Sequence, residues 1–274
     1  MASVKCNHEE YEVLMTLKQT HASIIFLAKN KENKKVLIKM AIKESFNNLM
    51  KNECIILSKL KHKYVQDILN CCNIGLKAVI IMSYYENYQP LHKKKNLDLI
   101  EIIRVITMLL EAVEYIHKNN IVHRDIKPPN ILVSPDAKDL KLIDFATAIN
   151  LNDPRYAPKK VYSLGGFTSP EQYNLGGAKF QYDIWSICST ILYLMTKELP
   201  FFFFKNYPTL ETKIDTTLIK TVLTYLYNRY IAEELTDILH KGLIYGSRKG
   251  FKSVSELKES IIKIFINLDT DLSK

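Results

Sequence analysis

Glycine and long apolar runs are both scarce in this sequence. Only 8 of the 274 residues are glycine, well below the usual share of about 7%. Because glycine lets a backbone approach a ligand closely, turns that hold phosphate through backbone amides should be few. The most apolar stretches, around 97–117 and 184–195, are interrupted by charge or too short to cross a bilayer. The N-terminus lacks an apolar secretory segment, so we expect an intracellular protein, cytoplasmic or nuclear, without a membrane partner.

Cysteine occurs as an odd set without any C-x-x-C spacing. Its five members are Cys6, Cys54, Cys71, Cys72 and Cys188. This pattern indicates neither a zinc site nor a disulfide framework. It fits a reducing compartment.

Positive charge exceeds negative charge. Lysine and arginine total 38 and the acids total 29, which gives a formal net charge of +9. A basic surface attracts acidic substrates, nucleotides or nucleic acid without choosing among them, and a diffusely basic solvated surface is the simpler explanation. An apolar share of 47% is ordinary for a globular protein.

The first 85 residues have the pattern of a small sheet with one helix. Two β-branched runs flank a polar turn in 23–40, which predicts a β-hairpin. Residues 46–60 place apolar side chains at helical spacing, and 77–85 form a short apolar strand. We therefore predict a small β-rich lobe over residues 1–83.

Helical patterns dominate the remainder, 84–274, which we predict to be a larger second lobe beyond a hinge near 83–87. A long amphipathic helix is predicted over 97–120, with this apolar face: Ile100, Ile103, Ile106, Leu110, Val113 and Ile116. Further helices are predicted over 183–196, 216–230 and 253–265. The fold class is therefore α+β, with two lobes that together form one domain.

The stretch HRDIKPPN, residues 123–130, contains five polar or charged side chains of the types that catalyse reactions. A second predicted hairpin, 131–143, separates it from Asp144 and returns the chain on itself, so Asp125, Asn130 and Asp144 can converge. Oxygen-bearing side chains suit Mg²⁺, which completes its shell with phosphate and water. A carboxylate beside them can accept a proton from a hydroxyl nucleophile, and Lys127 would place positive charge on a transferring phosphate.

These residues resemble the catalytic loop H-R-D-x-K-x-x-N and, at Asp144, the D-F-G loop of eukaryotic-type protein kinases. The resemblance covers nearly the whole chain in order. It implies that Asp125 is the catalytic base and that Asn130 and Asp144 hold the metal ions, Mg²⁺ or Mn²⁺. Lys127 resembles the lysine that marks serine/threonine rather than tyrosine specificity. The implied activity is transfer of the γ-phosphoryl group of ATP to serine or threonine hydroxyls of a protein substrate.

The same family implies a bilobal α+β fold, in agreement with the predicted lobes. A short N-terminal lobe and a composition rich in Lys, Ile and Asn also resemble compact kinases of large DNA viruses, of the baculovirus late-kinase type. Nucleic acid is not expected as a partner. The physiological substrate and the oligomeric state are not indicated by the sequence.

Three further motifs match the family. KKVLIKM resembles the strand that carries the nucleotide-binding lysine, here Lys39, and Glu53 is its expected acidic partner. Glu44 is a weaker alternative because it precedes the apolar helical stripe. The segment that joins the lobes is expected to contact adenine and consists of Met82, Ser83, Tyr84 and Tyr85.

The end of the activation segment is recognisable as well. SPE at 169–171 resembles the family's A-P-E motif, so the segment should run from Asp144 to Glu171. The family pairs this glutamate with a late arginine, here Arg248. Asp183 resembles the aspartate that holds the backbone of the catalytic loop.

The largest departure is the loss of all three glycines of the family's glycine-rich loop. Aligned over 17–28, Lys18, Thr20 and Ser23 occupy the glycine positions and are expected to lie at the nucleotide. Losing two or three backbone contacts at about 1 kcal/mol each predicts ATP binding weakened by roughly 10- to 100-fold. The side chains of Lys18 and Thr20 are candidate substitute donors.

Two more departures concern Ala146 and Leu164. Ala146 replaces the glycine of D-F-G, at a cost of about 1–2 kcal/mol where the position needs a left-handed backbone. Leu164 occupies the place of a threonine that contacts the catalytic loop in the family.

Two function classes follow. All the groups that perform the chemistry are present, which favours an active kinase: Lys39, Glu53, Asp125, Lys127, Asn130 and Asp144. The altered loop, Ala146 and Leu164 favour a pseudokinase, a regulatory binding module with weakened ATP binding. Nucleic-acid binding has only the net charge in its support.

Overall fold

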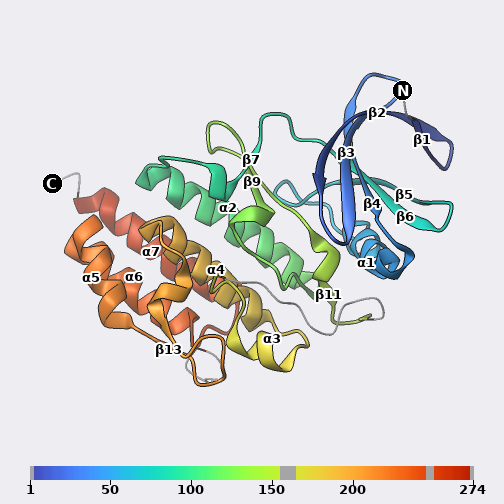
Figure 1. The fold of residues 1–274 in the computed structure, drawn as a ribbon. Coiled ribbons are helices and arrows are strands. Elements are labelled where there is room, and N and C mark those ends of the chain that lie inside the picture. Colours follow the sequence, from blue (N-terminus) through green and yellow to red (C-terminus); the bar gives the residue numbers. More distant parts are fainter. Residues whose placement is uncertain (1–2, 155–164, 245–249, 272–274) are drawn as a thin grey trace.

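The computed structural model describes residues 3–154, 165–244 and 250–271. These residues form a bilobal α+β fold, with a β-rich N-terminal lobe and a larger helical C-terminal lobe (Figure 1). The predicted fold class is confirmed. Among the described residues, no helix is long and apolar enough to cross a membrane.

A six-stranded antiparallel sheet forms the N-terminal lobe. In chain order its strands are β1 (Ser3–Cys6), β2 (Glu9–Gln19), β3 (Ser23–Lys29), β4 (Lys35–Ala41), β5 (Ile68–Ile74) and β6 (Lys77–Ser83). Their order in the sheet is β1-β2-β3-β4-β6-β5. The predicted hairpin is β3–β4 and the predicted apolar strand is β6, whereas β1, β2 and β5 were not predicted.

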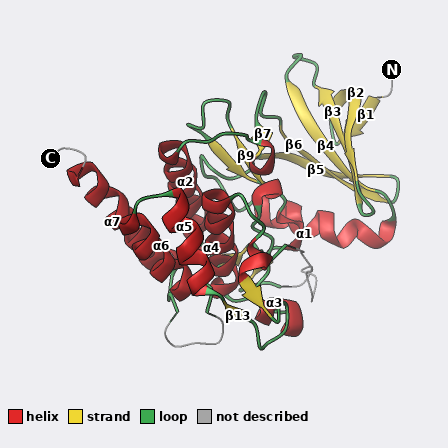
Figure 2. Cartoon of the chain, turned by 60° about the vertical axis from the view of Figure 1, so that its left-hand side comes forward, coloured by secondary structure: helices red, strands yellow, loops and turns green. Residues whose placement is uncertain are grey.

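Helix α1 (Asn47–Leu57) follows the short 3-10 turn η1 (Glu44–Phe46) and packs on one face of this sheet (Figure 2). It lies within the predicted range 46–60. Met50, Ile56 and Leu57 are buried and join the main apolar core. Because these side chains recur at helical spacing, they form a stripe that faces the sheet and sets the position of the helix.

The other face of the sheet encloses a small second core. Its members are Cys6, Tyr11, Ala28, Val36, Ile38, Val79 and Ile81. Strands β1 and β5 are the two edges of the sheet, yet Asn7, next to β1, donates from Nδ2 to Oδ1 of Asn70 on β5 at 2.7 Å. The sheet therefore curls so that its edges meet, as strongly twisted sheets do.

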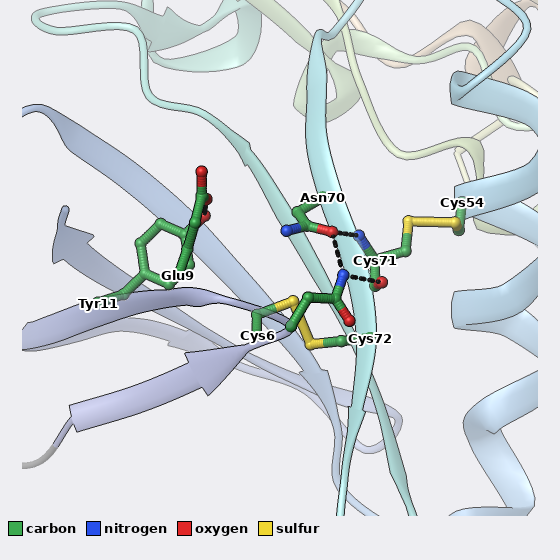
Figure 3. Close-up of a disulfide and its surroundings, with 8 residues drawn as sticks. Cys6, Glu9, Tyr11, Cys54, Asn70, Cys71 and Cys72 are labelled. Atoms are coloured by element: carbon green, nitrogen blue, oxygen red, sulfur yellow. Dashed lines mark hydrogen bonds between the residues drawn. A yellow bond between two sulfur atoms is a disulfide. The ribbon is translucent and has the colours of Figure 1, made fainter.

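Two disulfides correct the expectation that the cysteines form no disulfide framework. Cys6 of β1 is bonded to Cys72 of β5, and Cys54 of α1 to Cys71 of β5, with Cα–Cα separations of 5.5 and 6.4 Å (Figure 3). Neighbouring residues of a strand point to opposite faces, so the adjacent Cys71 and Cys72 meet different partners. The first pair is 66 residues apart along the chain and the second is 17 residues apart, so both come together only through folding. Cys188 is a buried free thiol.

The C-terminal lobe is built around α2 (Leu99–Lys118) and α4 (Phe180–Thr196). Asp98 and Glu101 form a capping box that fixes the start of α2. The predicted apolar face is largely correct, but Ile100 is 66% exposed. It lies in the first turn of the helix, where the buried face begins only at Ile102.

The remaining helices are α3 (Pro170–Leu175), α5 (Thr216–Leu226), α6 (Arg229–Gly242) and α7 (Val254–Asp271). The predicted helix 216–230 is two helices. Asn228 caps α6 by accepting a hydrogen bond from the N–H of Ile231 at 2.9 Å, and such a cap requires a non-helical backbone. The chain therefore turns between Leu226 and Arg229.

Short strands position the segments that carry the chemistry. They are β7 (Gln89–Pro90), β8 (Ile121–Val122), β9 (Ile131–Val133), β10 (Leu140–Leu142) and β11 (Ile149–Asn150), and the remaining pair is β12 (Phe204–Lys205) with β13 (Lys213–Ile214). Strands β9 and β10 pair as the predicted second hairpin. Four 3-10 turns complete the described part of the lobe: η2 (Leu91–Lys93), η3 (Pro128–Asn130), η4 (Phe145–Thr147) and η5 (Pro200–Phe203).

Candidate active site

The catalytic loop, residues 123–130, is held by two helices from later in the chain. The buried carboxylate of Asp183, on α4, accepts hydrogen bonds from the N–H groups of His123 and Arg124, both at 2.8 Å. Gln172, on α3, donates to the carbonyl oxygen of Arg124 at 2.7 Å. These contacts fix Arg124 at φ 71°, a conformation that costs a bulky residue of order 1–3 kcal/mol. The predicted contact of Asp183 with the catalytic-loop backbone is confirmed.

Both carboxylate oxygens of Asp125 are oriented by neighbours in the loop. Lys127 Nζ lies 2.8 Å from Oδ1, and Asn130 Nδ2 donates to Oδ2 at 2.8 Å and to the Asp125 carbonyl oxygen at 2.9 Å. Burial raises the pKa of Asp125, and Lys127 opposes that change. An aspartate that is fixed in this way, with a raised pKa, has the properties of a general base.

Lys39 joins the two lobes through two acids. Its Nζ lies 2.6 Å from Glu53 Oε2 and 2.8 Å from Asp144 Oδ1. Burial alone would lower the pKa of Lys39, but Asp144 and Glu53 together raise it. Burial also works against the charge of Asp144, yet Lys39 holds the pKa of that carboxyl at about 2. Burial raises the pKa of Glu53, and Lys39 opposes that change. The three groups thus form one cluster around the Lys39 ammonium group, and the alternative partner Glu44 is exposed in η1.

The segment after Asp144 is tied to α1 by hydrogen bonds. The N–H of Phe145 donates to Glu53 Oε1 at 3.2 Å. Asn52 Nδ2 donates to the carbonyl oxygens of Ala146 and Ala148 at 3.0 and 2.8 Å. The left-handed residue is Asp144, with φ 67°, and Ala146 lies in η4. The cost expected for a left-handed alanine therefore does not arise here.

The donor atoms at this point suit a hard divalent cation. Because Asn130 directs its Nδ2 at Asp125, its Oδ1 points elsewhere, and Lys39 contacts Oδ1 of Asp144. The N–H of Ile143 donates to the carbonyl oxygen of Asn130 at 3.0 Å, so the two ligand candidates lie on adjoining segments. Within the described ranges, no three His, Cys, Asp or Glu side chains form a metal site. An amide and a carboxylate oxygen fit Mg²⁺, which keeps water and phosphate as its other ligands.

The segment that joins the lobes is fixed against the start of β5. Met82 is buried at the end of β6. Ser83 donates its N–H to the carbonyl oxygen of Asp67 at 3.1 Å and accepts from Gln66 Nε2 at 3.1 Å. A carbonyl has two lone pairs, so Ser83 can still accept from a base, but its N–H is used within the protein. The adenine contacts of Tyr84 and Tyr85 stay predictions.

The three residues that replace glycine lie at and beside the turn between β2 and β3: Lys18 on β2, Thr20 in the turn and Ser23 at the start of β3. Thr20 donates its N–H to the carbonyl oxygen of Ser23 at 2.8 Å. Its Oγ1 accepts from the N–H groups of Ala22 and Ser23 at 3.2 and 3.0 Å and donates to the Ser23 carbonyl oxygen at 3.1 Å. Three amides of the turn are thus used by the turn itself, while Lys18 is exposed on β2.

The end of the activation segment is formed by α3. Ser169 caps this helix by accepting from the N–H of Gln172 at 3.1 Å. Glu171 pairs with Lys179. Arg248, its predicted partner, lies outside the described residues, as does Leu164.

Asn52 and Gln172 hold the backbone of the candidate site and were not predicted from the sequence. Both are buried amides, with exposed fractions of 5% and 0%, and a buried amide must find hydrogen-bond partners. Asn52 directly precedes Glu53 within an apolar helical stripe, and a polar residue in such a stripe is the signal that would have identified it.

Comparison with known proteins identifies the family. Residues 11–257 match the protein kinase domain. The match spans most of the chain and includes every residue of the site described above. This chain therefore belongs to the protein kinase domain family, and the resemblance to eukaryotic-type serine/threonine kinases is confirmed. The likeness to compact viral kinases stays a prediction.

Among its relatives are three that show the range of likeness. A probable serine/threonine-protein kinase of Dictyostelium discoideum is 29% identical over 164 residues, 59% of this chain and 33% of its own length. Calcium-dependent protein kinase 4 of Plasmodium berghei is 24% identical over 276 residues, 96% of this chain and 51% of its own. A probable inactive serine/threonine-protein kinase of D. discoideum is 30% identical over 174 residues, which are 60% of this chain and 14% of its own length. The chain thus spans about half the length of these relatives, or less.

Proposed function

We propose that this chain is an ATP-dependent protein serine/threonine kinase that works with Mg²⁺ or Mn²⁺. The observation that carries the proposal is the convergence of two clusters of ion pairs and hydrogen bonds, Asp125 with Lys127 and Asn130, and Lys39 with Glu53 and Asp144. They supply a base, a phosphate-binding cation and hard oxygen ligands at one place. Phosphoryl transfer needs little more, because it is catalysed chiefly by positioning and charge stabilisation.

In this proposal, Asp125 accepts the proton of a serine or threonine hydroxyl while that oxygen attacks the γ-phosphorus. Lys127 and Asn130 hold the two carboxylate oxygens, so the base does not have to reorganise during the reaction. Its raised pKa makes it a better proton acceptor than a solvated aspartate, provided that the pH keeps it ionised.

Lys39 is positioned to neutralise the α- and β-phosphates of ATP. Its contact with Glu53 is buried, with the two side chains 7% and 1% exposed, so its ammonium group has a fixed place. Asn130 and Asp144 would hold the divalent ion, which neutralises phosphate charge when bound. Lys127 adds a further positive charge beside Asp125.

The finer assignments belong to the same proposal. We place the division between the lobes at residues 83/84, with 1–83 and 84–274 forming one kinase domain. The substrates are proteins with serine or threonine acceptors, because Lys127 matches the family's lysine for that specificity. The adenine-contacting residues are Met82, Ser83, Tyr84 and Tyr85, and Lys18, Thr20 and Ser23 lie at the phosphates.

Metal-dependent transfer of ³²P from labelled ATP to a generic protein substrate tests this function. Asp125→Asn keeps the size of the side chain and one acceptor oxygen but removes the base, so kcat should fall by about 10²–10⁴-fold. Binding of ATP, followed as a shift in melting temperature, should be retained in the variant. Equal silence of the wild type and Asp125→Asn, with ATP still bound, would overturn the enzymatic function.

A second candidate is a pseudokinase that binds ATP weakly and acts as a regulatory module. The observation in its favour is the turn at 20–23, whose amides bond to one another, and a relative named as a probable inactive kinase is 30% identical over 174 residues. This candidate requires the outcome just described, in which ATP stabilises the fold without turnover. The complete set of chemical groups makes the active kinase the better supported function.

A further inference from the structure

Three consecutive residues of α1 contact three different parts of the molecule. Asn52 holds the segment after Asp144, and Glu53 pairs with Lys39. Cys54 is bonded to Cys71 of β5 (Figure 3). The residue that pairs with the nucleotide-binding lysine therefore lies next to a covalent link between its helix and the sheet.

The strand register places this link and the ion pair in one row across the sheet. Cys71 of β5 lies opposite Ile80 of β6, and Ile80 lies opposite Lys39 of β4. Residues directly opposite each other in paired strands point to the same face, so Cys71 and Lys39 both face α1. The disulfide thus anchors the helix at the row where Glu53 must meet Lys39.

The second disulfide provides a natural comparison. Cys72 lies opposite Val79, and it packs against the small core on the other face of the sheet, to which Val79 belongs. Its bond to Cys6 joins β1 to β5 and does not include α1. Two cross-links start from adjacent residues of one strand, and only one of them restrains the helix that carries Glu53.

We propose that Cys54 and Cys71 are positioning residues for phosphoryl transfer, because their disulfide holds α1 where Glu53 meets Lys39. The inference rests on the kinase function proposed above. Reduction of the bond releases α1 and lowers turnover, and reoxidation restores it. The effect is partial, since Asn52 and Glu53 still tie α1 to the segment after Asp144.

The redox step is ordinary thiol–disulfide exchange with a dithiol. One thiolate of the dithiol attacks a cysteine sulfur, forms a mixed disulfide and releases the other cysteine as a thiolate. The second thiol of the reagent then displaces the first cysteine and closes a cyclic disulfide. The protein gains two electrons and two protons, and the dithiol loses them. Access is provided by a cavity of about 220 Å³ that Cys54 and Cys71 both line.

Two double variants of the full chain separate the cross-links. Cys54→Ser with Cys71→Ser removes the bond to α1. Cys6→Ser with Cys72→Ser removes the other bond, so that neither cysteine can exchange disulfides with Cys54 or Cys71. Each protein and the wild type are assayed after oxidation by oxidised glutathione and after reduction by dithiothreitol, with intact mass reporting the bonds present. A fourth protein, Glu53→Gln, shows whether the effect passes through the ion pair.

We expect reduction to lower kcat about fivefold in the wild type and in the Cys6/Cys72 double variant. The Cys54/Cys71 double variant should have the low value in both states, and Glu53→Gln should not respond to reduction because the pair is already broken. Hydrogen exchange of residues 47–57 should speed up whenever the Cys54–Cys71 bond is absent. An effect that follows the Cys6–Cys72 bond, or a response of Glu53→Gln equal to that of the wild type, would overturn the proposal.

The exchange measurement keeps this inference separate from the proposed function. If no protein transfers phosphate, the kinase function fails, but the exchange of residues 47–57 still reports whether the bond positions α1. Unchanged exchange with and without the bond would overturn the inference even if the enzyme is active. The same holds if the intact mass of the oxidised wild type shows that Cys54 and Cys71 have not lost their two thiol hydrogens, because the disulfide is then not formed.

Discussion

The catalytic loop and the β2–β3 turn are held in opposite ways. In the loop, His123 and Arg124 depend on Asp183 and Gln172, which are 48 to 60 residues away along the chain. In the turn, the bonds join residues three or fewer positions apart. A loop fixed by distant helices cannot change alone, whereas a turn that satisfies its own amides can lose its glycines and still form. The segment that matches the family's motif is therefore the one held from a distance, and the segment without the family's glycines is the one that holds itself.

Removing the distant support should produce the largest effect. Asp183→Ala leaves the N–H groups of His123 and Arg124 buried without their acceptor, so the free energy of unfolding should fall by about 3–5 kcal/mol and kcat by about 100-fold. Urea unfolding and steady-state kinetics measure the two quantities. Should the alanine variant not fold, Asp183→Asn, which keeps one acceptor oxygen, should give a smaller loss in both.

Asp215→Ala is the matched control for this change. Asp215 caps α5 at the surface by accepting from the N–H of Leu218 at 3.0 Å. Its loss should cost only about 1 kcal/mol and leave kcat unchanged. Equal losses in the Asp183 and Asp215 variants would mean that distant support of the loop is not special.

Removing a local partner inside the catalytic loop should have a smaller effect on stability but a clear pH signature. Lys127 opposes the rise that burial causes in the pKa of Asp125, so Lys127→Met should raise this pKa further. A general base works in its ionised form, so activity is lost as the pH falls through its pKa. The acid limb of kcat/KM should therefore move to higher pH, while kcat at its plateau falls by about 10²-fold.

A pH–rate profile of Lys127→Met beside the exposed control Lys31→Met measures the shift. Lys31 lies in the β3–β4 turn, and its replacement should leave the profile in place. An acid limb at the wild-type position in Lys127→Met would show that Asp125 is not the titrating base.

Changing the β2–β3 turn should give the smallest effect. Unlike the two changes above, it should improve one property, the binding of ATP. Thr20→Gly frees the N–H groups of Ala22 and Ser23, which then become available to phosphate. One or two contacts at about 1 kcal/mol each should lower the KM for ATP by about 5- to 30-fold, and the loss of the turn bonds should cost about 1 kcal/mol of stability. Kinetics at varied ATP concentration and thermal unfolding provide both values.

Thr209→Gly controls for this substitution. Thr209 makes similar bonds in a turn of the helical lobe, to the carbonyl oxygen of Asn206 at 2.7 Å and from the N–H of Glu211 at 3.2 Å. Its replacement should reduce stability by a comparable amount without changing the KM for ATP. A KM that is unaltered by Thr20→Gly would show that the glycine-free turn is not what limits nucleotide binding.

Much of the site follows from local sequence, for a physical reason. Chemistry demands particular side chains at fixed spacing, so Asp125, Lys127 and Asn130 are visible as a motif within six positions. The periodic apolar residues of 46–60 and 97–120 likewise predict α1 and α2. The errors fall where periodicity is short or interrupted: the 216–230 stretch is split by the Asn228 cap, and β1, β2 and β5 were not predicted.

By itself, the sequence determined the family, the two-lobed class and the identity of the chemical groups, because these depend on residue types and their local spacing. The tertiary structure alone decided which distant groups touch. It brought Asn52 to the segment after Asp144 and made Asp144, rather than Ala146, the left-handed residue. It also turned Cys71 and Cys72 to opposite faces of one strand. Such contacts depend on how helices and strands pack, and spacing along the chain does not encode them.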